Sequence, residues 1–100
     1  MRILDKFRLD DKIAIITGGA GFLGRRHAKA ICEAGGIAVL WDINEKIAAG
    51  AARQISRTRG LRCSGFAVDI TDNRSVKDAL TKVIRQFKRA DILINNAAHN

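Results

Sequence analysis

The segment ITGGAGFLGRRHAK, residues 16–29, places a cluster of glycines between an apolar stretch and a basic, helix-like one. Gly18, Gly19, Gly21 and Gly24 fall close together in a chain that contains 9 glycines in 100 residues. The preceding run KIAIIT, residues 12–17, is apolar and short, as is typical of a strand covered on both faces. The segment therefore predicts a strand, a tight glycine turn and the start of a helix.

The same alternation of apolar runs and helical spacing continues along the chain. Further strands are predicted at IAVLW (37–41), CSGFAV (63–68) and ILIN (92–95). The first helix ends at Gly35 and Gly36, the second is capped by Asn44, and the third starts at Thr71 or Asp72. The positions predicted to face the core from these three helices are Leu23, His27, Ala30, Ile31 and Ala34; Ile47, Ala48, Ala51, Ala52 and Ile55; and Val76, Ala79, Leu80, Val83, Ile84 and Phe87.

Strands that alternate with crossover helices predict an α/β fold with a doubly wound parallel sheet, because each crossover is right-handed and covers the strands that it joins. We expect a partial, Rossmann-like sheet with strand order 3-2-1-4. A ligand crevice is then expected where the order reverses, between the first and fourth strands at their C-terminal ends. The glycine cluster lies at that edge of the sheet.

Composition and charge limit the classes of partner. Hydrophobic residues make up 47% of the chain and charged residues 28%, which is a globular balance for one small domain. No apolar run approaches the ~20 residues of a membrane span, and MRILDKFRLDDK lacks the apolar centre of a secretory signal, so a cytoplasmic location is predicted. The net charge of +8 is spread over helix-like segments without an aromatic platform or a DNA-reading helix, which favours an anionic cofactor over nucleic acid.

The cysteines, His27 and Trp41 are expected to have structural roles only. Cys32 and Cys63 belong to no CxxC pair, so they predict neither a zinc site nor a disulfide framework and are expected to be buried, reduced thiols. His27 lies on the predicted apolar stripe of its helix and is expected to pack in the core, as is Trp41. The sequence thus predicts no metal site.

The glycine cluster fits a dinucleotide-binding pattern. Gly19-Ala20-Gly21-Phe22-Leu23-Gly24 matches G-x-G-x-x-G directly after a strand and at the start of a helix, where free amides can bind a pyrophosphate. Asp42 ends the second strand, where a carboxylate can bind ribose hydroxyls and repels a 2′-phosphate. NAD is therefore favoured over NADP, although Arg25 and Arg26 would offset part of that repulsion.

Two plainer interpretations of these motifs stay open. The glycines could form a tight turn that binds no ligand, and Asp42 could serve only to cap the second helix. A P-loop nucleotide hydrolase is disfavoured, because no Gly-Lys-Ser/Thr follows the glycines.

Three motifs in order along the chain resemble those of the short-chain dehydrogenases/reductases. Thr17-Gly18-x-x-Gly21-x-x-Gly24 is similar to the glycine motif of the extended, epimerase-like branch. The segments AVDITD (67–72) and LINNAA (93–98) are similar to the adenine-contacting and Asn-Asn-Ala-Gly motifs of the shorter, oxidoreductase branch, with Ala98 in place of the last glycine. The resemblance covers nearly the whole chain.

The resemblance implies further roles for individual residues. Asp69 and Ile70 would contact the adenine ring, with a turn carboxylate as the alternative role for Asp69. Asn95, Asn96 and Ala97 would border the adenosine ribose and the cofactor, and Asn95 would also tie neighbouring strands together. The complete set of expected cofactor-binding residues is Thr17, Gly18, Gly19, Gly21, Phe22, Leu23, Gly24, Asp42, Ile43, Asp69, Ile70, Asn95, Asn96 and Ala97.

The activity implied by the resemblance is hydride transfer between a nicotinamide and an alcohol or carbonyl, with Tyr, Lys and Ser as catalytic residues. The chain contains no tyrosine, so no catalytic residue is assigned. Residues 1–100 are therefore predicted to be the cofactor-binding half-domain of an NAD-dependent oxidoreductase, truncated after the fourth strand, whose open edge predicts a homo-oligomer. The alternatives are a non-catalytic dinucleotide-binding module, a nucleotide-sugar epimerase or dehydratase of the extended branch, and a basic interaction domain that has lost the ligand.

Overall fold

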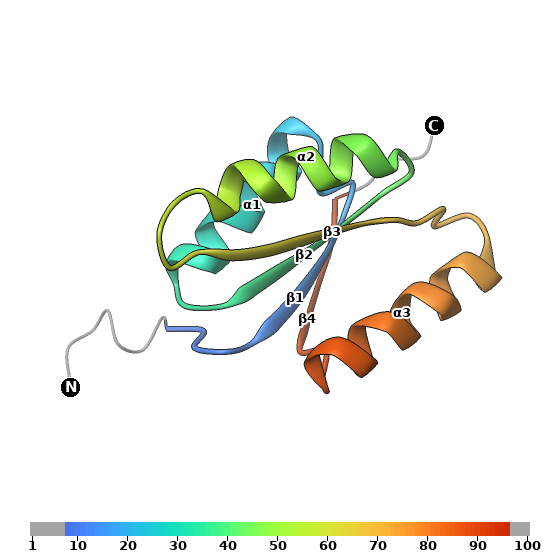
Figure 1. Ribbon diagram of the computed structural model, residues 1–100. Helices are drawn as coiled ribbons and strands as arrows, with labels where there is room; N and C mark the ends of the chain where they lie inside the picture. The colour runs from blue at the N-terminus through green and yellow to red at the C-terminus, as the bar shows by residue number, and fades with distance from the viewer. Residues whose placement is uncertain (1–7, 97–100) are drawn as a thin grey trace.

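The computed structural model describes residues 8–96, which alternate between strands and helices (Figure 1). The described elements are β1 (Ile13–Thr17), α1 (Phe22–Glu33), β2 (Ile37–Asp42), α2 (Glu45–Ser56), β3 (Arg62–Ala67), α3 (Asn73–Phe87) and β4 (Ile92–Asn95). The predicted order of elements is confirmed. The third strand is displaced by one residue from the predicted range, because its pairing with β2 runs from Arg62 to Ala67.

The four strands form one parallel sheet in the order β3-β2-β1-β4, which confirms the predicted topology. Figure 1 shows α1 and α2 on one face of the sheet and α3 on the other. Side chains along a strand alternate between the two faces. Ile16 and Leu40 accordingly pack beneath α1 and α2, whereas Ile15, Val39 and Trp41 pack against α3. Both central strands are therefore apolar at almost every position.

Helix α1 is rotated relative to the prediction, and the expectation that His27 packs in the core is wrong. The buried residues of α1 are Gly24, Ala28, Ile31 and Cys32, whereas His27 is exposed. The cause is steric, because Gly24 lies directly against the backbone of the glycine turn and so determines which stripe faces the sheet. Residues four, seven and eight positions after Gly24 then share its face.

Four further aliphatic side chains that are expected in the core are exposed instead: Leu23 at 57%, Ile47 at 48%, Leu80 at 41% and Ile84 at 43%. Helix α2 contacts the sheet through small residues, chiefly Ala48, Ala51 and Ala52, so the bulky Ile47 lies at its flank. On α3, only Ala79 and Val83 are fully buried. The small buried residues let α2 and α3 approach the sheet closely. The larger aliphatic side chains at the sides of each apolar stripe therefore stay exposed to solvent.

Asp91 joins the beginnings of β1 and β4. One carboxylate oxygen accepts hydrogen bonds from Arg89 at 2.7 and 2.9 Å, and the other accepts from the backbone N–H of Ile13 at 2.8 Å. The Arg89 guanidinium and, after it, the Ile13 amide hold the pKa of Asp91 below its usual range.

A lowered pKa in the folded state predicts a stabilisation that is present at neutral pH and lost in acid. The stabilisation is complete above the ordinary aspartate value of about 4 and disappears as the pH falls through the lower, folded-state pKa. Asp91→Asn should therefore lower the Tm at pH 7, and the difference from the unmodified chain should shrink toward zero as the pH falls through the lowered pKa of Asp91. Thermal unfolding followed by circular dichroism across this range measures the effect. Asp78→Asn, an exposed change on α3, is the control; a Tm difference for Asp91→Asn that is independent of pH would contradict the assignment.

Candidate dinucleotide-binding site

The glycine turn joins β1 to α1 at the C-terminal edge of the sheet. Gly18 has a φ of 64°, a left-handed conformation that favours glycine, and its carbonyl accepts a hydrogen bond from the N–H of Gly21 at 3.1 Å. The N–H of Gly19 donates to the carbonyl of Trp41 at 3.2 Å, which anchors the turn to β2. The predicted tight turn with a positive φ is therefore present.

Close packing requires glycine at two positions, Gly19 in the turn and Gly24 in the first turn of α1. A β-carbon at Gly24 would collide with the carbonyl oxygen of Gly18 and would lie 2.7 Å from the α-carbon of Gly19. A β-carbon at Gly19 would lie 2.8 Å from the Leu40 side chain on β2. These contacts hold the first turn of α1 directly against the glycine turn. Helix α1 is thus brought close to the sheet, as the sequence pattern predicted for Gly24.

The N-terminus of α1 differs from those of the other two helices. The Asn44 side chain caps α2 by accepting from the N–H of Ile47, and Asp72 caps α3 by accepting from the N–H of Arg74 and Ser75. Helix α1 begins after Gly21 and has no side-chain cap. The amides of its first turn, which carry the positive end of the helix dipole, are therefore available to an anion.

Two exposed apolar residues of α1 flank these amides. Phe22 is 73% exposed and Leu23 is 57% exposed, so neither contributes to the core. Both are predicted cofactor-binding residues, and their exposure leaves them accessible to a ligand.

Asp42 ends β2 next to the glycine turn and does not cap α2. Its side chain accepts the N–H of Asn44 at 3.3 Å, whereas the capping bond of α2 comes from Asn44 itself. The interpretation of Asp42 as only a helix cap is therefore wrong. The next residue, Ile43, is 74% exposed at the same edge.

The end of β4 is tied to β1 and to the glycine turn. The Thr17 hydroxyl donates to the side-chain oxygen of Asn95 at 2.9 Å and accepts from the backbone N–H of Asn96 at 3.0 Å. The side-chain amide of Asn96 donates to the carbonyl of Gly18 at 3.4 Å. The strand-linking role implied for Asn95 is confirmed, and Thr17 is its partner. The predicted residue Ala97, like Ala98, lies outside the described residues.

Asp69 lies in the turn after β3, beside the end of β2. The backbone N–H of Val68 donates to the carbonyl of Asp42 at 2.8 Å, which holds the two segments together. One carboxylate oxygen of Asp69 accepts from the Thr71 hydroxyl at 2.6 Å and from its N–H at 3.0 Å. Asp69 is thus a turn carboxylate, the alternative weighed for it, and its contact with adenine stays a prediction. Ile70 is 37% exposed next to it.

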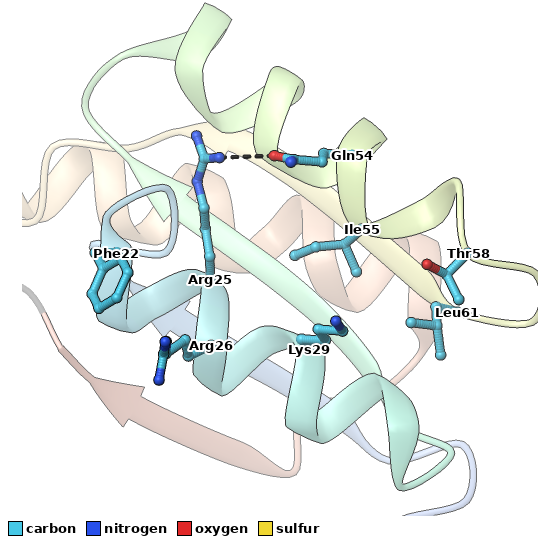
Figure 2. A pocket seen from close by; sticks show the side chains of 8 residues that line it. All are labelled: Phe22, Arg25, Arg26, Lys29, Gln54, Ile55, Thr58 and Leu61. Carbon is cyan, nitrogen blue, oxygen red and sulfur yellow. Dashed lines mark hydrogen bonds between the residues drawn. The ribbon is translucent and has the colours of Figure 1, made fainter.

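A groove that no sequence pattern predicts lies on the outer surface between α1 and α2 (Figure 2). Its volume is about 420 Å³. Arg25 crosses it, donating to the Gln54 side chain at 2.9 Å and to the carbonyl of Ala20 at 2.9 Å. The guanidinium of Arg26 lies 4.7 Å from the centre of the Phe22 ring. Both arginines, which were expected to offset repulsion of a 2′-phosphate, therefore contact the protein itself.

None of the helices within residues 8–96 combines the length and the apolar character that a membrane span requires. Within the same range, no three His, Cys, Asp or Glu side chains are grouped so that they could hold a metal ion. The expectation of two buried cysteines is confirmed only for Cys32, because Cys63 is partly buried.

A parallel sheet with an uncapped helix after a glycine turn, and an acidic residue at the end of the adjacent strand, defines the class of dinucleotide-binding α/β proteins. The family model described as short chain dehydrogenase matches residues 12–100. The chain belongs to this family.

Individual relatives and solved structures agree with this assignment. The chain is 40% identical over 91 residues to D-threitol dehydrogenase of Mycolicibacterium smegmatis, covering 91% of this chain and 35% of that protein. It is similar to a putative D-mannonate oxidoreductase from Haemophilus influenza with bound NAD, with a TM-score of 0.87 and 27% identity. That match covers 99% of this chain and 35% of the oxidoreductase. It is also similar to an NADPH-dependent 3-quinuclidinone reductase from Rhodotorula rubra, with a TM-score of 0.84 and 29% identity. That match covers 92% of this chain and 35% of the reductase.

These proteins are named as a dehydrogenase, a putative oxidoreductase and a reductase, so a nucleotide-sugar epimerase or dehydratase of the extended branch is not favoured. The chain spans about one third of the length of the curated relatives that it matches.

Proposed function

We propose that residues 1–100 are the dinucleotide-binding part of an oxidoreductase that transfers hydride between a nicotinamide cofactor and an alcohol or carbonyl substrate. The observation that carries the proposal is the glycine turn held against α1 by Gly24, with the uncapped first turn of the helix at the same sheet edge as Asp42. A turn that only connected β1 to α1 would not require the backbone of α1 at Gly24 to pack directly against the backbone of Gly18 and Gly19. The names of two similar proteins, D-threitol dehydrogenase and NADPH-dependent 3-quinuclidinone reductase, support the reaction class.

Each part of a dinucleotide has a matching group at this edge. The first-turn amides of α1 would bind the pyrophosphate, since they combine unpaired N–H donors with the positive end of the helix dipole. The Asp42 carboxylate would accept hydrogen bonds from the adenosine ribose. Asp69 and Ile70 would border the adenine, and Asn95 and Asn96 the side of the cofactor next to β4. The bound cofactor would supply the hydride acceptor or donor, while these residues position it.

The charges at this edge favour NAD over NADP. Asp42 would meet a 2′-phosphate as a like charge, which disfavours that cofactor. Arg25 and Arg26, the basic residues nearest the glycine turn in sequence, contact Gln54 and Phe22 in the structure. Each guanidinium therefore already has a contact within the protein and is not placed to bind a 2′-phosphate.

Calorimetric titration of the purified chain with NADH, ADP-ribose and nicotinamide mononucleotide tests the proposal. The α1 amides, Asp42, Asp69 and Ile70 are all assigned to the ADP part, so we expect NADH and ADP-ribose to bind with affinities within about tenfold of each other and the mononucleotide not to bind measurably. A folded chain that binds neither NADH nor ADP-ribose would overturn the proposal. Because the chain has no tyrosine, we expect binding without reduction of NAD by any alcohol in a panel.

The exposed apolar surface at β4 supports self-association. Strand β4 lies at the edge of the described sheet, and Leu93 is 66% exposed there. A hollow of about 290 Å³ beside it is lined by Trp41 and Leu80, among other residues. An apolar strand edge readily pairs with another chain. We propose that copies of this chain associate through β4.

Light scattering coupled to size exclusion tests this association over a range of concentrations. We expect the mass to exceed that of the monomer at high concentration and Leu93→Lys to restore the monomer, because a charged edge residue opposes strand pairing. Ile47→Lys, an equivalent change on the exposed flank of α2, should leave the mass unchanged. A monomeric mass at every concentration for the unmodified chain would refute the proposal.

A further inference from the structure

Arg25 binds the glycine turn from the groove between α1 and α2 (Figure 2). Its Nε donates to the carbonyl of Ala20 at 2.9 Å, and a terminal guanidinium nitrogen donates to the side-chain oxygen of Gln54 at 2.9 Å. The backbone N–H of Arg25 donates to the carbonyl of Gly21, also at 2.9 Å. Arg25 thus holds the two successive carbonyls that directly precede α1 and connects them to α2.

The hydrogen bond to Ala20 fixes the orientation of one peptide unit in the turn. The carbonyl of Ala20 and the N–H of Gly21 belong to the same planar, trans peptide, so they point in opposite directions. The N–H of Gly21 donates to the carbonyl of Gly18 at 3.1 Å. Arg25 therefore holds one side of this peptide while Gly18 holds the other. The next residue, Phe22, is the first of α1, so this peptide also sets the direction in which the helix begins.

This contact provides a support that a helix cap cannot provide at an anion site. The caps of α2 and α3, Asn44 and Asp72, stabilise the start of each helix by occupying its free amides. A similar cap on α1 would block the amides proposed to bind the pyrophosphate. Arg25 binds carbonyl groups instead, so the start of α1 is held while its amides stay available. Such support matters in a turn rich in glycine, which has the greatest backbone freedom of any residue.

Gln54 holds the Arg25 side chain in place from a different helix. It lies 29 residues further along the chain, next to Ile55, which packs in the core and so fixes this part of α2. The planar guanidinium offers several N–H donors in a rigid arrangement, so it can bind Ala20 and Gln54 at the same time. Lysine has a single terminal nitrogen and could not reproduce this geometry.

We propose that Arg25, held by Gln54, is a positioning residue that orients the glycine turn and the first-turn amides of α1 for the pyrophosphate of a dinucleotide. The inference rests on the proposed function and adds to it two residues that act through the turn. Their contribution is preorganisation, because a turn that must be ordered during binding lowers the affinity. The sequence analysis predicted for Arg25 only a charge effect on a 2′-phosphate.

Calorimetric titration of single and double variants with ADP-ribose tests the two positioning residues. We expect Arg25→Met to weaken binding about tenfold and Gln54→Met about threefold, since the second variant removes only the support of the guanidinium. The double variant should bind no more weakly than Arg25→Met, because Gln54 acts through Arg25. Independent, additive losses would overturn the role of Gln54. Circular dichroism verifies folding, and the exposed change at Gln54 is the milder variant if Arg25→Met is unstable.

Arg26→Met is the matched control for loss of positive charge near the turn. Its guanidinium lies 4.7 Å from the centre of the Phe22 ring, and the substitution removes the same charge one residue further along α1. We expect a change in ADP-ribose affinity of at most about twofold, because exposed charges are screened by salt. Arg25→Lys, which keeps the charge, should recover only part of the affinity lost in Arg25→Met. Equal losses in Arg25→Met and Arg26→Met would show a charge effect and overturn the proposal.

Amide hydrogen exchange followed by nuclear magnetic resonance measures the orientation of the turn without a ligand. In Arg25→Met the N–H of Gly21 should exchange at least about fivefold faster, because its peptide loses the bond to the guanidinium. The N–H of Ile47, bound by the cap of α2, is the internal reference and should not change. Unchanged exchange at Gly21 would overturn the inference.

The two measurements separate this inference from the proposed function. If the unmodified chain and Arg25→Met bind ADP-ribose equally tightly, the inference is wrong and the proposed function stands. If the unmodified chain does not bind ADP-ribose, the proposed function fails and the binding role of Arg25 fails with it. Exchange at Gly21 then decides whether Arg25 orients the turn.

Discussion

Gly24→Ala is expected to lower the Tm of the chain by about 10 °C and to abolish NADH binding. The added methyl would collide with the carbonyl of Gly18 and lie 2.7 Å from the α-carbon of Gly19. Both neighbours are backbone atoms of the same tight turn, so neither can rotate away as a flexible side chain would. Relief requires α1 to move away from the turn, which costs packing energy of about 1–3 kcal/mol and displaces the amides proposed to bind the pyrophosphate.

Gly50→Ala is the matched control for this experiment. Gly50 lies inside α2, and the nearest atom to an added β-carbon is the end of the Arg53 side chain at 4.0 Å. Alanine in an open helical position stabilises by about 0.5–1 kcal/mol relative to glycine. We therefore expect Gly50→Ala to raise the Tm slightly and to leave NADH affinity unchanged. If both variants melt alike and bind alike, the close approach at Gly24 has no role in stability or binding.

The second large effect concerns the choice of cofactor at Asp42. We expect the chain to bind NADH at least about tenfold more tightly than NADPH, since charge-assisted hydrogen bonds contribute roughly 1.5–3 kcal/mol and a 2′-phosphate adds repulsion. Asp42→Asn removes the charge in a side chain of the same shape, which can still accept the N–H of Asn44. The ratio of the two dissociation constants should then fall toward one.

Calorimetric titration of the unmodified chain and the variant with both cofactors measures this ratio. Asp78→Asn makes the same charge change on the exposed side of α3 and should leave the ratio unaltered, so a general effect of net charge is separated from a local one. Equal affinities of the unmodified chain for NADH and NADPH would reject Asp42 as the ribose-binding residue. An unchanged ratio of the two dissociation constants in Asp42→Asn would also reject Asp42 as the ribose-binding residue. Binding of either cofactor would still support the dinucleotide site.

Much of the fold could be predicted because its causes are local or follow from general rules of connection. The caps at Asn44 and Asp72 each use a backbone N–H two or three residues away, so the residue type and its position suffice. The strand order β3-β2-β1-β4 follows from right-handed crossovers between successive parallel strands. The glycine spacing around Gly18 and Gly24 likewise reflects a turn formed within a few residues.

The tertiary structure decided the features that join distant parts of the chain. Helical periodicity placed His27 in the core, but the contact of Gly24 with the glycine turn selected a different face of α1. A periodic pattern defines a stripe only approximately, and packing against a specific neighbour fixes the rotation.

Hydrogen bonds between side chains that lie far apart in the sequence could not be predicted either. The Thr17–Asn95 bond joins residues 78 positions apart, and the Arg25–Gln54 bond joins residues 29 apart. Such pairs form only after the sheet and helices have assembled, because each partner is placed by a different element. By itself the sequence thus determined the elements, their order and the candidate edge for a dinucleotide, through local backbone and capping chemistry. Which side chains meet was decided by tertiary packing alone.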